Sequence, residues 1–178
     1  MSRPSEKLFV FGERLEVLRK ETGFLHWRLA NAMGAERKIV SNWIGGVNIP
    51  DAVIVKWLAV YFNVSADWLL GIISERRRVN YDKSLLPDEE SMQGAGCKRK
   101  HRSLPILVER LNVIIAYRKI SKEALAYRLG RDRKTVYRCV NGKSVPNAYM
   151  LRELATFFHV SADWLLGLSD RVDGELQR

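Results

Sequence analysis

Two Arg-Lys pairs, at residues 37–38 and 133–134, are the side chains of this 178-residue sequence best suited to recognition chemistry. Guanidinium and ammonium groups on the exposed first turn of a helix can donate hydrogen bonds to phosphate oxygens and to the O6 and N7 atoms of guanine. A single pair of this kind would more often be a solvated helix surface. Because the pair occurs twice in similar surroundings, contact with nucleic acid is the favoured interpretation.

Catalytic and metal-binding chemistry has little support in the same sequence. The three histidines, His26, His101 and His159, are far apart, and no nucleophile has a base at a recognisable spacing. The chain has two cysteines, Cys97 and Cys139, and no glycine-rich loop of the kind that cradles phosphates. We therefore expect no enzyme, no catalytic residue, no cofactor, no metal site and no disulfide framework.

The sequence contains an internal repeat. Residues 11–71 align with residues 107–167 at a shift of 96 without gaps, and 24 of the 61 positions are identical. Both copies end in the heptapeptide SADWLLG, and each is large enough, though only marginally, to fold alone. The expected domains are an N-terminal domain at 1–73, a charged flexible linker at 74–103, and a C-terminal domain with a short tail at 104–178.

Apolar stripes, capping residues and glycines predict five helices in each copy and no strand, so the expected fold class is all-α. In the first copy an opening helix carries Leu8, Phe11, Leu15 and Leu18, and a fourth helix follows Asp51. SADWLLG predicts a fifth short helix, with serine as N-cap, tryptophan as core anchor and glycine in a left-handed C′ position. The second and third helices are expected at 25–33 and 36–44 in the first copy, and at 121–129 and 132–140 in the second.

Two stretches each predict a helix, a turn that contains glycine, and a second helix: LHWRLANAMGAERKIVSNWI and SKEALAYRLGRDRKTVYRCV. Gly34 and Gly130 can adopt the positive φ of such a turn. With the flanking helices in the same order over 8–72 and 104–168, the pattern resembles the lambda-repressor-like (Cro-type) helix-turn-helix family. The resemblance implies a sequence-specific regulator of transcription, most often a repressor, that inserts its third helix into the major groove of double-stranded DNA. A phage-like regulatory role is compatible with it.

If the third helices enter the major groove, as the resemblance implies, their exposed residues determine which bases are preferred. One turn beyond the shared Arg-Lys pair, the first copy has asparagine, which suits adenine, where the second has arginine, which suits guanine. Two related but non-identical half-sites are therefore expected. The expected base contacts are Arg37, Lys38, Ser41 and Asn42 in the first copy, and Arg133, Lys134, Tyr137 and Arg138 in the second.

Phosphate contacts are expected at the start of the second helix and around the third. Family members often carry glutamine at the first position, where this sequence has His26 and Lys122. After the third helix, Lys143 has Val47 as its counterpart, so the second copy is expected to be the stronger phosphate clamp. The expected phosphate contacts are His26, Lys122, Arg131 and Lys143.

Two positions depart from the family pattern. The common ion pair between the first and third helices is expected to be absent, because Arg19 would have Ile44 as its partner. Cys139 replaces the aromatic Trp43 of the first copy and is expected to be a buried thiol.

The segment between the copies has acidic and basic blocks without periodicity, which is typical of a flexible tether. Its roughly 32 residues would span about 30 Å, close to the ~34 Å between half-sites one helical turn apart. Such a tether leaves direct and inverted half-sites equally allowed. Within it, Lys98, Arg99, Lys100 and Arg102 could act as an arm in the minor groove, although a solvated basic linker is the more common state.

Composition limits the remaining possibilities. An apolar content of 47% excludes a disordered chain, and no apolar run is long enough for a membrane span or has the form of a signal peptide. We expect a cytoplasmic protein, associated with the nucleoid when bound to DNA. The net charge of +10 favours an anionic partner and is uneven: +2 over 1–73 (9 basic, 7 acidic), +3 over 74–105 (8, 5) and +5 over 106–178 (13, 8).

A second class of function stays open. One copy, preferably the N-terminal one, could dock a protein partner, and exposure of both Trp27 and Trp43 would favour that alternative. A homodimer is compatible with the family, although an internal pair of copies would replace it. No membrane partner and no small-molecule ligand are expected.

Overall fold

The structure is a computed structural model that describes residues 4–86 and 104–172. Within these ranges the chain is all-α, which confirms the predicted fold class, and it contains two isolated β-bridges but no strand. The first copy forms α1 (Pro4–Glu21), α2 (His26–Ala32), α3 (Arg37–Ile44), α4 (Ala52–Phe62) and α5 (Ala66–Leu69), followed by a 3-10 helix, η1 (Lys83–Leu85). The second forms α7 (Pro105–Tyr117), α8 (Lys122–Arg128), α9 (Arg133–Val140), α10 (Ala148–Phe158) and α11 (Ala162–Leu165).

Side-chain caps start α4, α5 and the four helices α8 to α11, whereas α2, α3 and α7 begin without one. Ser65 accepts from the backbone N–H groups of Asp67 and Trp68, which confirms it as the N-cap of α5, and Ser161 does the same for α11. Glu36 makes no such cap at α3, whereas its counterpart Asp132 accepts from Thr135 N–H at 3.0 Å. The other side-chain caps are Asp51 on α4, Asp82 on η1, Ser121 on α8 and Asn147 on α10.

The buried apolar side chains of both copies form one continuous core. Trp68 and Trp164 are buried, as predicted, and a guanidinium lies over each ring, Arg14 at 4.9 Å and Arg110 at 5.0 Å from the centroid. Each arginine also donates to the carbonyl of its tryptophan. The two copies therefore build their cores with the same device.

The two copies pack against each other through equivalent elements, α4 against α10 and α5 against α11. Ala52 N donates to Pro146 O at 2.9 Å, and Ala148 N donates to Pro50 O at 2.8 Å. Ala52 and Ala148 are equivalent residues of the two copies, as are Pro50 and Pro146, so each copy donates to the other in the same way. The contact is thus reciprocal, as in a two-fold dimer interface made by one chain.

Two buried carboxylates lie at the centre of this contact. Asp67 accepts from Ser161 Oγ at 2.5 Å and from Ala162 N at 2.7 Å. Asp163 accepts from Ser65 Oγ at 2.6 Å and from Ala66 N at 2.7 Å. The aspartate of SADWLLG in each copy therefore bonds to the helix start of the other copy. The identical heptapeptides are complementary to one another.

Burial raises the pKa of Asp67 to about 6, and the nearby charge of Asp163 adds to the shift. Hydrogen bonds from Ser161 and from the backbone act in the opposite direction but do not cancel it. The interface therefore contains a carboxyl group that titrates in a mildly acidic range, well above its ordinary value.

Residues 74–86 pack against the first copy and reach the interface. Tyr81 is buried, and its hydroxyl donates to Asp163 at 2.9 Å. The expectation of a flexible linker is wrong for this segment, while the rest of that linker, residues 87–103, lies outside the described residues. The backbone bonds that hold the segment are Ser65 N to Arg77 O at 3.2 Å and Val79 N to Asn63 O at 3.0 Å.

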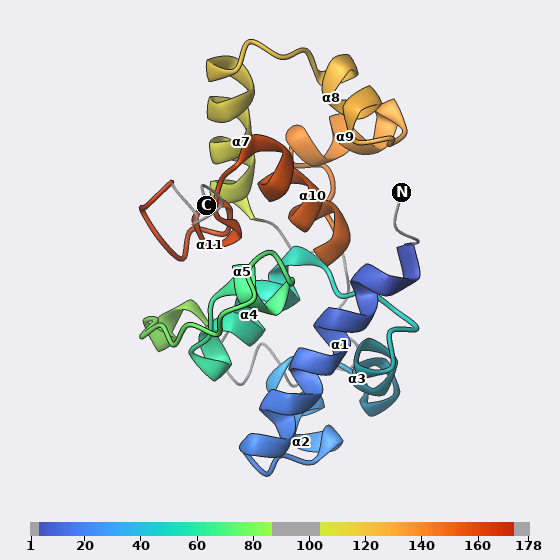
Figure 1. Cartoon of the computed structure of the whole chain (residues 1–178), viewed down its shortest axis with the longest axis vertical. Helices are drawn as coiled ribbons and strands as arrows, with labels where there is room; N and C mark the ends of the chain where they lie inside the picture. The colour runs from blue at the N-terminus through green and yellow to red at the C-terminus, as the bar shows by residue number, and fades with distance from the viewer. Residues whose placement is uncertain (1–3, 87–103, 173–178) are drawn as a thin grey trace.

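The packing leaves the two helix-turn-helix pairs at opposite ends of the molecule. Figure 1 shows α2 and α3 at one end, α8 and α9 at the other, and α4, α5 and α10 between them. Among the described residues, no helix is long and apolar enough to cross a membrane.

Candidate nucleic-acid interface

Helix α3 separates its buried side chains from those proposed to contact bases. Val40 and Trp43 are buried in the core, whereas Arg37, Lys38 and Ser41 are exposed and Asn42 is half-buried. The short turn before α3 contains Gly34 at a φ of 56°, which confirms the predicted left-handed glycine. Helix α3 therefore presents its first two turns outward.

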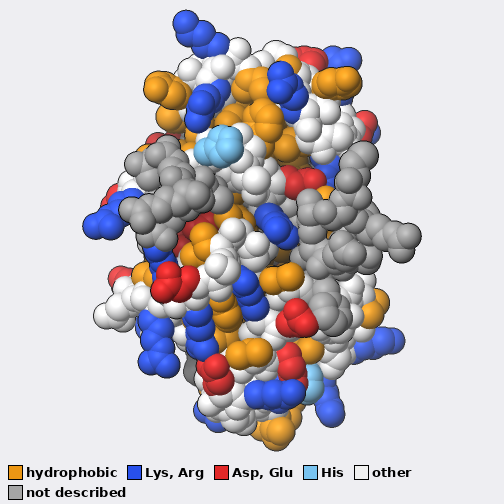
Figure 2. All heavy atoms as spheres, in the orientation of Figure 1, with side chains coloured by type: hydrophobic (Ala, Val, Ile, Leu, Met, Phe, Trp, Pro, Cys, Tyr) orange, Lys and Arg blue, Asp and Glu red, His pale blue; other side chains and the backbone are white. Residues whose placement is uncertain are grey.

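Helix α9 repeats this arrangement in the second copy. Val136 and Cys139 are buried, which confirms Cys139 as a core thiol, and burial raises its pKa to about 12. The predicted contacts Arg133, Lys134 and Arg138 are exposed, and Tyr137 is half-buried. Both third helices thus display polar residues at equivalent positions. On the face shown in Figure 2, Lys and Arg side chains occur at both ends of the molecule, beside exposed hydrophobic ones.

An acidic residue that sequence reasoning missed lies on the outer face of the second copy. Glu123 on α8 pairs with Arg133 at 3.5 Å and accepts a hydrogen bond from the Tyr137 hydroxyl. That hydrogen bond lowers the pKa of Glu123 and raises the pKa of Tyr137. Glu123 therefore competes for the two predicted base contacts Arg133 and Tyr137. The sequence signal that could have identified Glu123 was its position directly after the predicted phosphate ligand Lys122, at the start of the helix.

Lys122 connects the beginning of α8 with the end of α9. Its Nζ donates to Asn141 Oδ1 at 2.8 Å and lies 5.6 Å from the centroid of the Tyr137 ring. Lys143 is exposed in the following turn. The structure thus brings the predicted phosphate ligand Lys122 next to the predicted base contact Tyr137. Asn141 is a further polar residue of this surface that the sequence analysis did not select.

Arg131, another predicted phosphate ligand, is engaged inside the domain. Its Nε and terminal nitrogen donate to Glu153 Oε2 at 3.0 and 2.8 Å, and its guanidinium lies 4.8 Å from the Tyr149 ring centroid. In the first copy Ala35 occupies the position of Arg131. Arg131 therefore anchors the turn before α9 to α10, and its role as a phosphate contact gains no support from this geometry.

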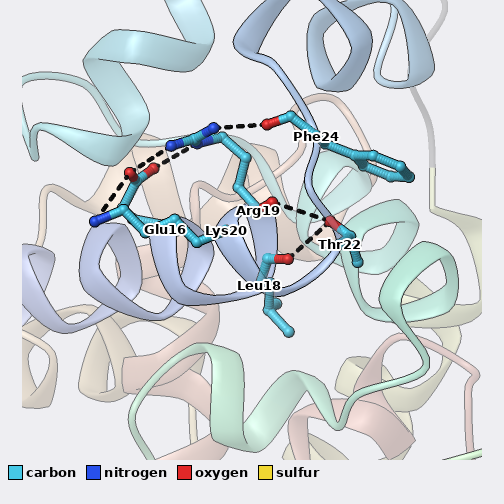
Figure 3. Close-up of polar contacts among 6 residues, drawn as sticks. All are labelled: Glu16, Leu18, Arg19, Lys20, Thr22 and Phe24. Atoms are coloured by element: carbon cyan, nitrogen blue, oxygen red, sulfur yellow. Dashed lines mark hydrogen bonds and ion pairs between the residues drawn. The ribbon is translucent and has the colours of Figure 1, made fainter.

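In the first copy a polar network fixes the turn that leads into α2 (Figure 3). Arg19 pairs with Glu16 at 2.6 and 2.7 Å and donates to the carbonyl of Phe24 at 2.6 Å. The hydrogen bond from Arg19 lowers the pKa of Glu16. Arg19 thus pairs within α1 and positions the start of α2, where His26 is half-buried.

Four positions on the outer face of the helix-turn-helix carry exposed apolar side chains in the first copy and polar ones in the second. Trp27 is 53% exposed and Val47 73% exposed. Trp43, by contrast, is only 5% exposed, so the condition that both tryptophans lie on the surface is not met. The four pairs are Leu25 and Ser121, Trp27 and Glu123, Ile39 and Thr135, and Val47 and Lys143.

Comparison with known proteins yields no match among family models, curated proteins or solved structures. The described residues hold no group of three or more His, Cys, Asp or Glu side chains placed to bind a metal ion. Lys98, Arg99, Lys100 and Arg102, predicted as a minor-groove arm, lie outside the described residues. The observed chemistry consists of two exposed helix faces that carry cationic and amide donors.

Proposed function

We propose that this protein is a sequence-specific regulator of transcription that acts as a repressor. It binds double-stranded DNA through two lambda-repressor-like helix-turn-helix units. The observation that carries the proposal is the equivalent placement of Arg37-Lys38 and Arg133-Lys134 on the exposed first turn of α3 and α9. A helix presented this way suits the major groove, where its N-terminal residues contact base edges. Occupation of promoter DNA would block transcription in the cytoplasm, on the nucleoid.

The polar surroundings of α9 are compatible with exchange of partners on DNA. The ion pair between Arg133 and Glu123 is solvent-exposed, and such pairs contribute only about 0–1 kcal/mol. A bidentate contact from arginine to guanine discriminates by about 1–3 kcal/mol. The loss of the ion pair between Arg133 and Glu123 is therefore small enough for a good base contact to offset. Lys122 and Lys143 would bind the flanking phosphates.

The exposed apolar positions favour one alternative, in which the first copy docks a protein partner. Leu25, Trp27 and Val47 would provide apolar contact area that Ser121, Glu123 and Lys143 do not. The same copy keeps the Arg37-Lys38 pair, which a protein-docking function alone leaves without a role. For this reason DNA binding by both copies is our main proposal.

Selection from a random duplex library by the intact chain tests the proposal. At fixed, near-physiological salt, we expect enrichment of a motif with two unequal halves, one recognised by α3 and one by α9. A motif with a single half would restrict DNA reading to one copy and support the docking alternative. Absence of any enriched motif would refute sequence-specific regulation.

A further inference from the structure

The contact between the copies has the symmetry of an isologous dimer. Two kinds of bond between the copies occur in both directions: Ser65 with Asp163 and Ser161 with Asp67, and likewise for Ala52 and Ala148. The bonds from Tyr81 to Asp163 and from Arg152 to the carbonyl of Gly71 are additional to this exchange. A head-to-tail contact would join two different surfaces and would not show this exchange. The two copies are therefore related by a rotation close to two-fold, and not by a translation along the chain.

The contact also resists sliding. The carboxylates of Asp67 and Asp163 are buried, and each accepts a serine hydroxyl and a backbone N–H from the opposite copy. A shift of one copy against the other would leave these buried acceptors without donors, which is unfavourable. The Tyr81 hydroxyl, bonded to Asp163, attaches residues 74–86 to the same point. The orientation of the copies is thus set by packing.

A two-fold rotation determines how the recognition helices meet DNA. It carries α3 onto α9, and a reader with this symmetry matches half-sites that are inverted on the duplex. Direct repeats would require a translation, which the reciprocal bonds do not allow. The side chains at the two reading positions nevertheless differ, Asn42 in one copy and Arg138 in the other.

Resting on the proposed function, we infer that one chain acts as its own dimer partner and binds an inverted pair of unequal half-sites at one fixed spacing. The operator is therefore approximately, but not fully, palindromic. Its two halves share the bases read by the Arg-Lys pairs. They differ at the base read by Asn42 in α3 and by Arg138 in α9, which lie one turn of the α-helix beyond those pairs. The binding unit is a single chain, and it can occupy the operator in only one of the two directions with full affinity.

The test uses the intact chain and duplexes that carry the two selected half-sites in defined arrangements. Affinity is measured for the inverted pair, for the direct repeat, for a single half-site, and for the inverted pair with five extra base pairs in the centre. Five base pairs are about half of the ~10–10.5 bp helical turn and move one half-site to the opposite face of the duplex. Analytical ultracentrifugation counts chains per duplex.

We expect the inverted pair to bind on the order of 100-fold more tightly than one half-site, because the second contact is intramolecular. The insertion and the direct repeat should both reduce affinity to that of a single half-site, with one chain per duplex. Equal binding to direct and inverted repeats, tolerance of the insertion, or two chains per duplex would overturn the inference but leave DNA recognition intact. No binding to any duplex would refute the proposed function itself.

Discussion

The two helix-turn-helix units share their inner faces and differ on their outer ones. Val40 and Val136 are both buried, and Gly34 and Gly130 both form the left-handed turn. On the outside, the first copy exposes Trp27 where the second has Glu123. The buried positions are restricted by packing, whereas the exposed ones are free to change the ligand. The comparison shows that one scaffold carries two outer surfaces that differ in polarity at these positions.

Charge reversal at the third helices should have the largest effect. We expect Arg133→Glu with Lys134→Glu to weaken DNA binding on the order of 100-fold, because Lys122 and Lys143 make α9 the more basic surface. The matched change, Arg37→Glu with Lys38→Glu, should cost about tenfold. Titration of the selected duplex by fluorescence anisotropy measures both losses.

The control for this pair is Arg78→Glu with Arg171→Glu, which makes the same charge change at exposed residues outside both helix-turn-helix units. It should alter affinity only slightly. If the control weakens binding as much as the α9 variant, the effect is one of net charge, and the assignment of the two reading surfaces fails.

Exchange of a reading residue should change specificity at one base pair. Asn42→Arg gives α3 the residue that α9 carries at the equivalent position, so the preferred base should change from adenine to guanine. We expect about a tenfold change in relative affinity for duplexes that differ only there. Selection of the unchanged base by the variant would show that Asn42 does not read DNA.

The two interface aspartates provide a smaller, pH-dependent contrast. The raised pKa of Asp67 means that the folded state binds more protons than the unfolded state, so this group stabilises the fold below about pH 4 and loses that contribution as pH rises through about 6. Between pH 7 and pH 5 the wild type should gain on the order of 1 kcal/mol relative to Asp67→Asn. Urea unfolding of both proteins at each pH measures the difference.

Asp163→Asn is the matched variant for this test. Asp163 accepts the Tyr81 hydroxyl in addition to the bonds it shares by symmetry with Asp67, so its replacement should destabilise the protein more at pH 7. Identical pH profiles for the wild type and Asp67→Asn would contradict the placement of a titrating carboxyl in the interface.

Replacement of the apolar outer residues should have the smallest effect. Leu25→Ser with Trp27→Gln removes side chains that are more than half exposed, so the free energy of unfolding should change by less than about 0.5 kcal/mol. DNA affinity should also remain close to that of the wild type. A large loss of DNA affinity would place these residues in the DNA contact and weaken the contrast between the two surfaces.

Local sequence chemistry was sufficient to predict the helices. Capping residues such as Asp51, Ser65 and Asp132 start helices where predicted, because these preferences act over one or two turns. The left-handed glycine Gly71 follows α5, also as predicted. The exposure of Arg37 and the burial of Val40 also follow from helical periodicity. The identification of these surfaces as DNA-binding stays a prediction.

Contacts between distant segments were not predictable in the same way. Asp67 looked like an ordinary first-turn acid, because nothing in its neighbourhood reveals that Ser161 lies against it. Residues 74–86 lack periodicity, and their packing depends on Tyr81, which reaches a carboxylate of the other copy. Glu123 was overlooked for a similar reason: its partners, Arg133 and Tyr137, lie on another helix.

The central claim is that α3 and α9 read the major groove of one duplex. Replacement of individual guanines in the selected motif by 7-deazaguanine tests it most directly, because this base keeps pairing but lacks the N7 acceptor that arginine and lysine use. We predict that substitution in either half-site weakens binding of the wild type. A variant that has lost the Arg-Lys pair reading that half-site should show no further loss of affinity upon the same substitution. Unchanged affinity after substitution of every guanine in both halves would contradict major-groove reading by these helices.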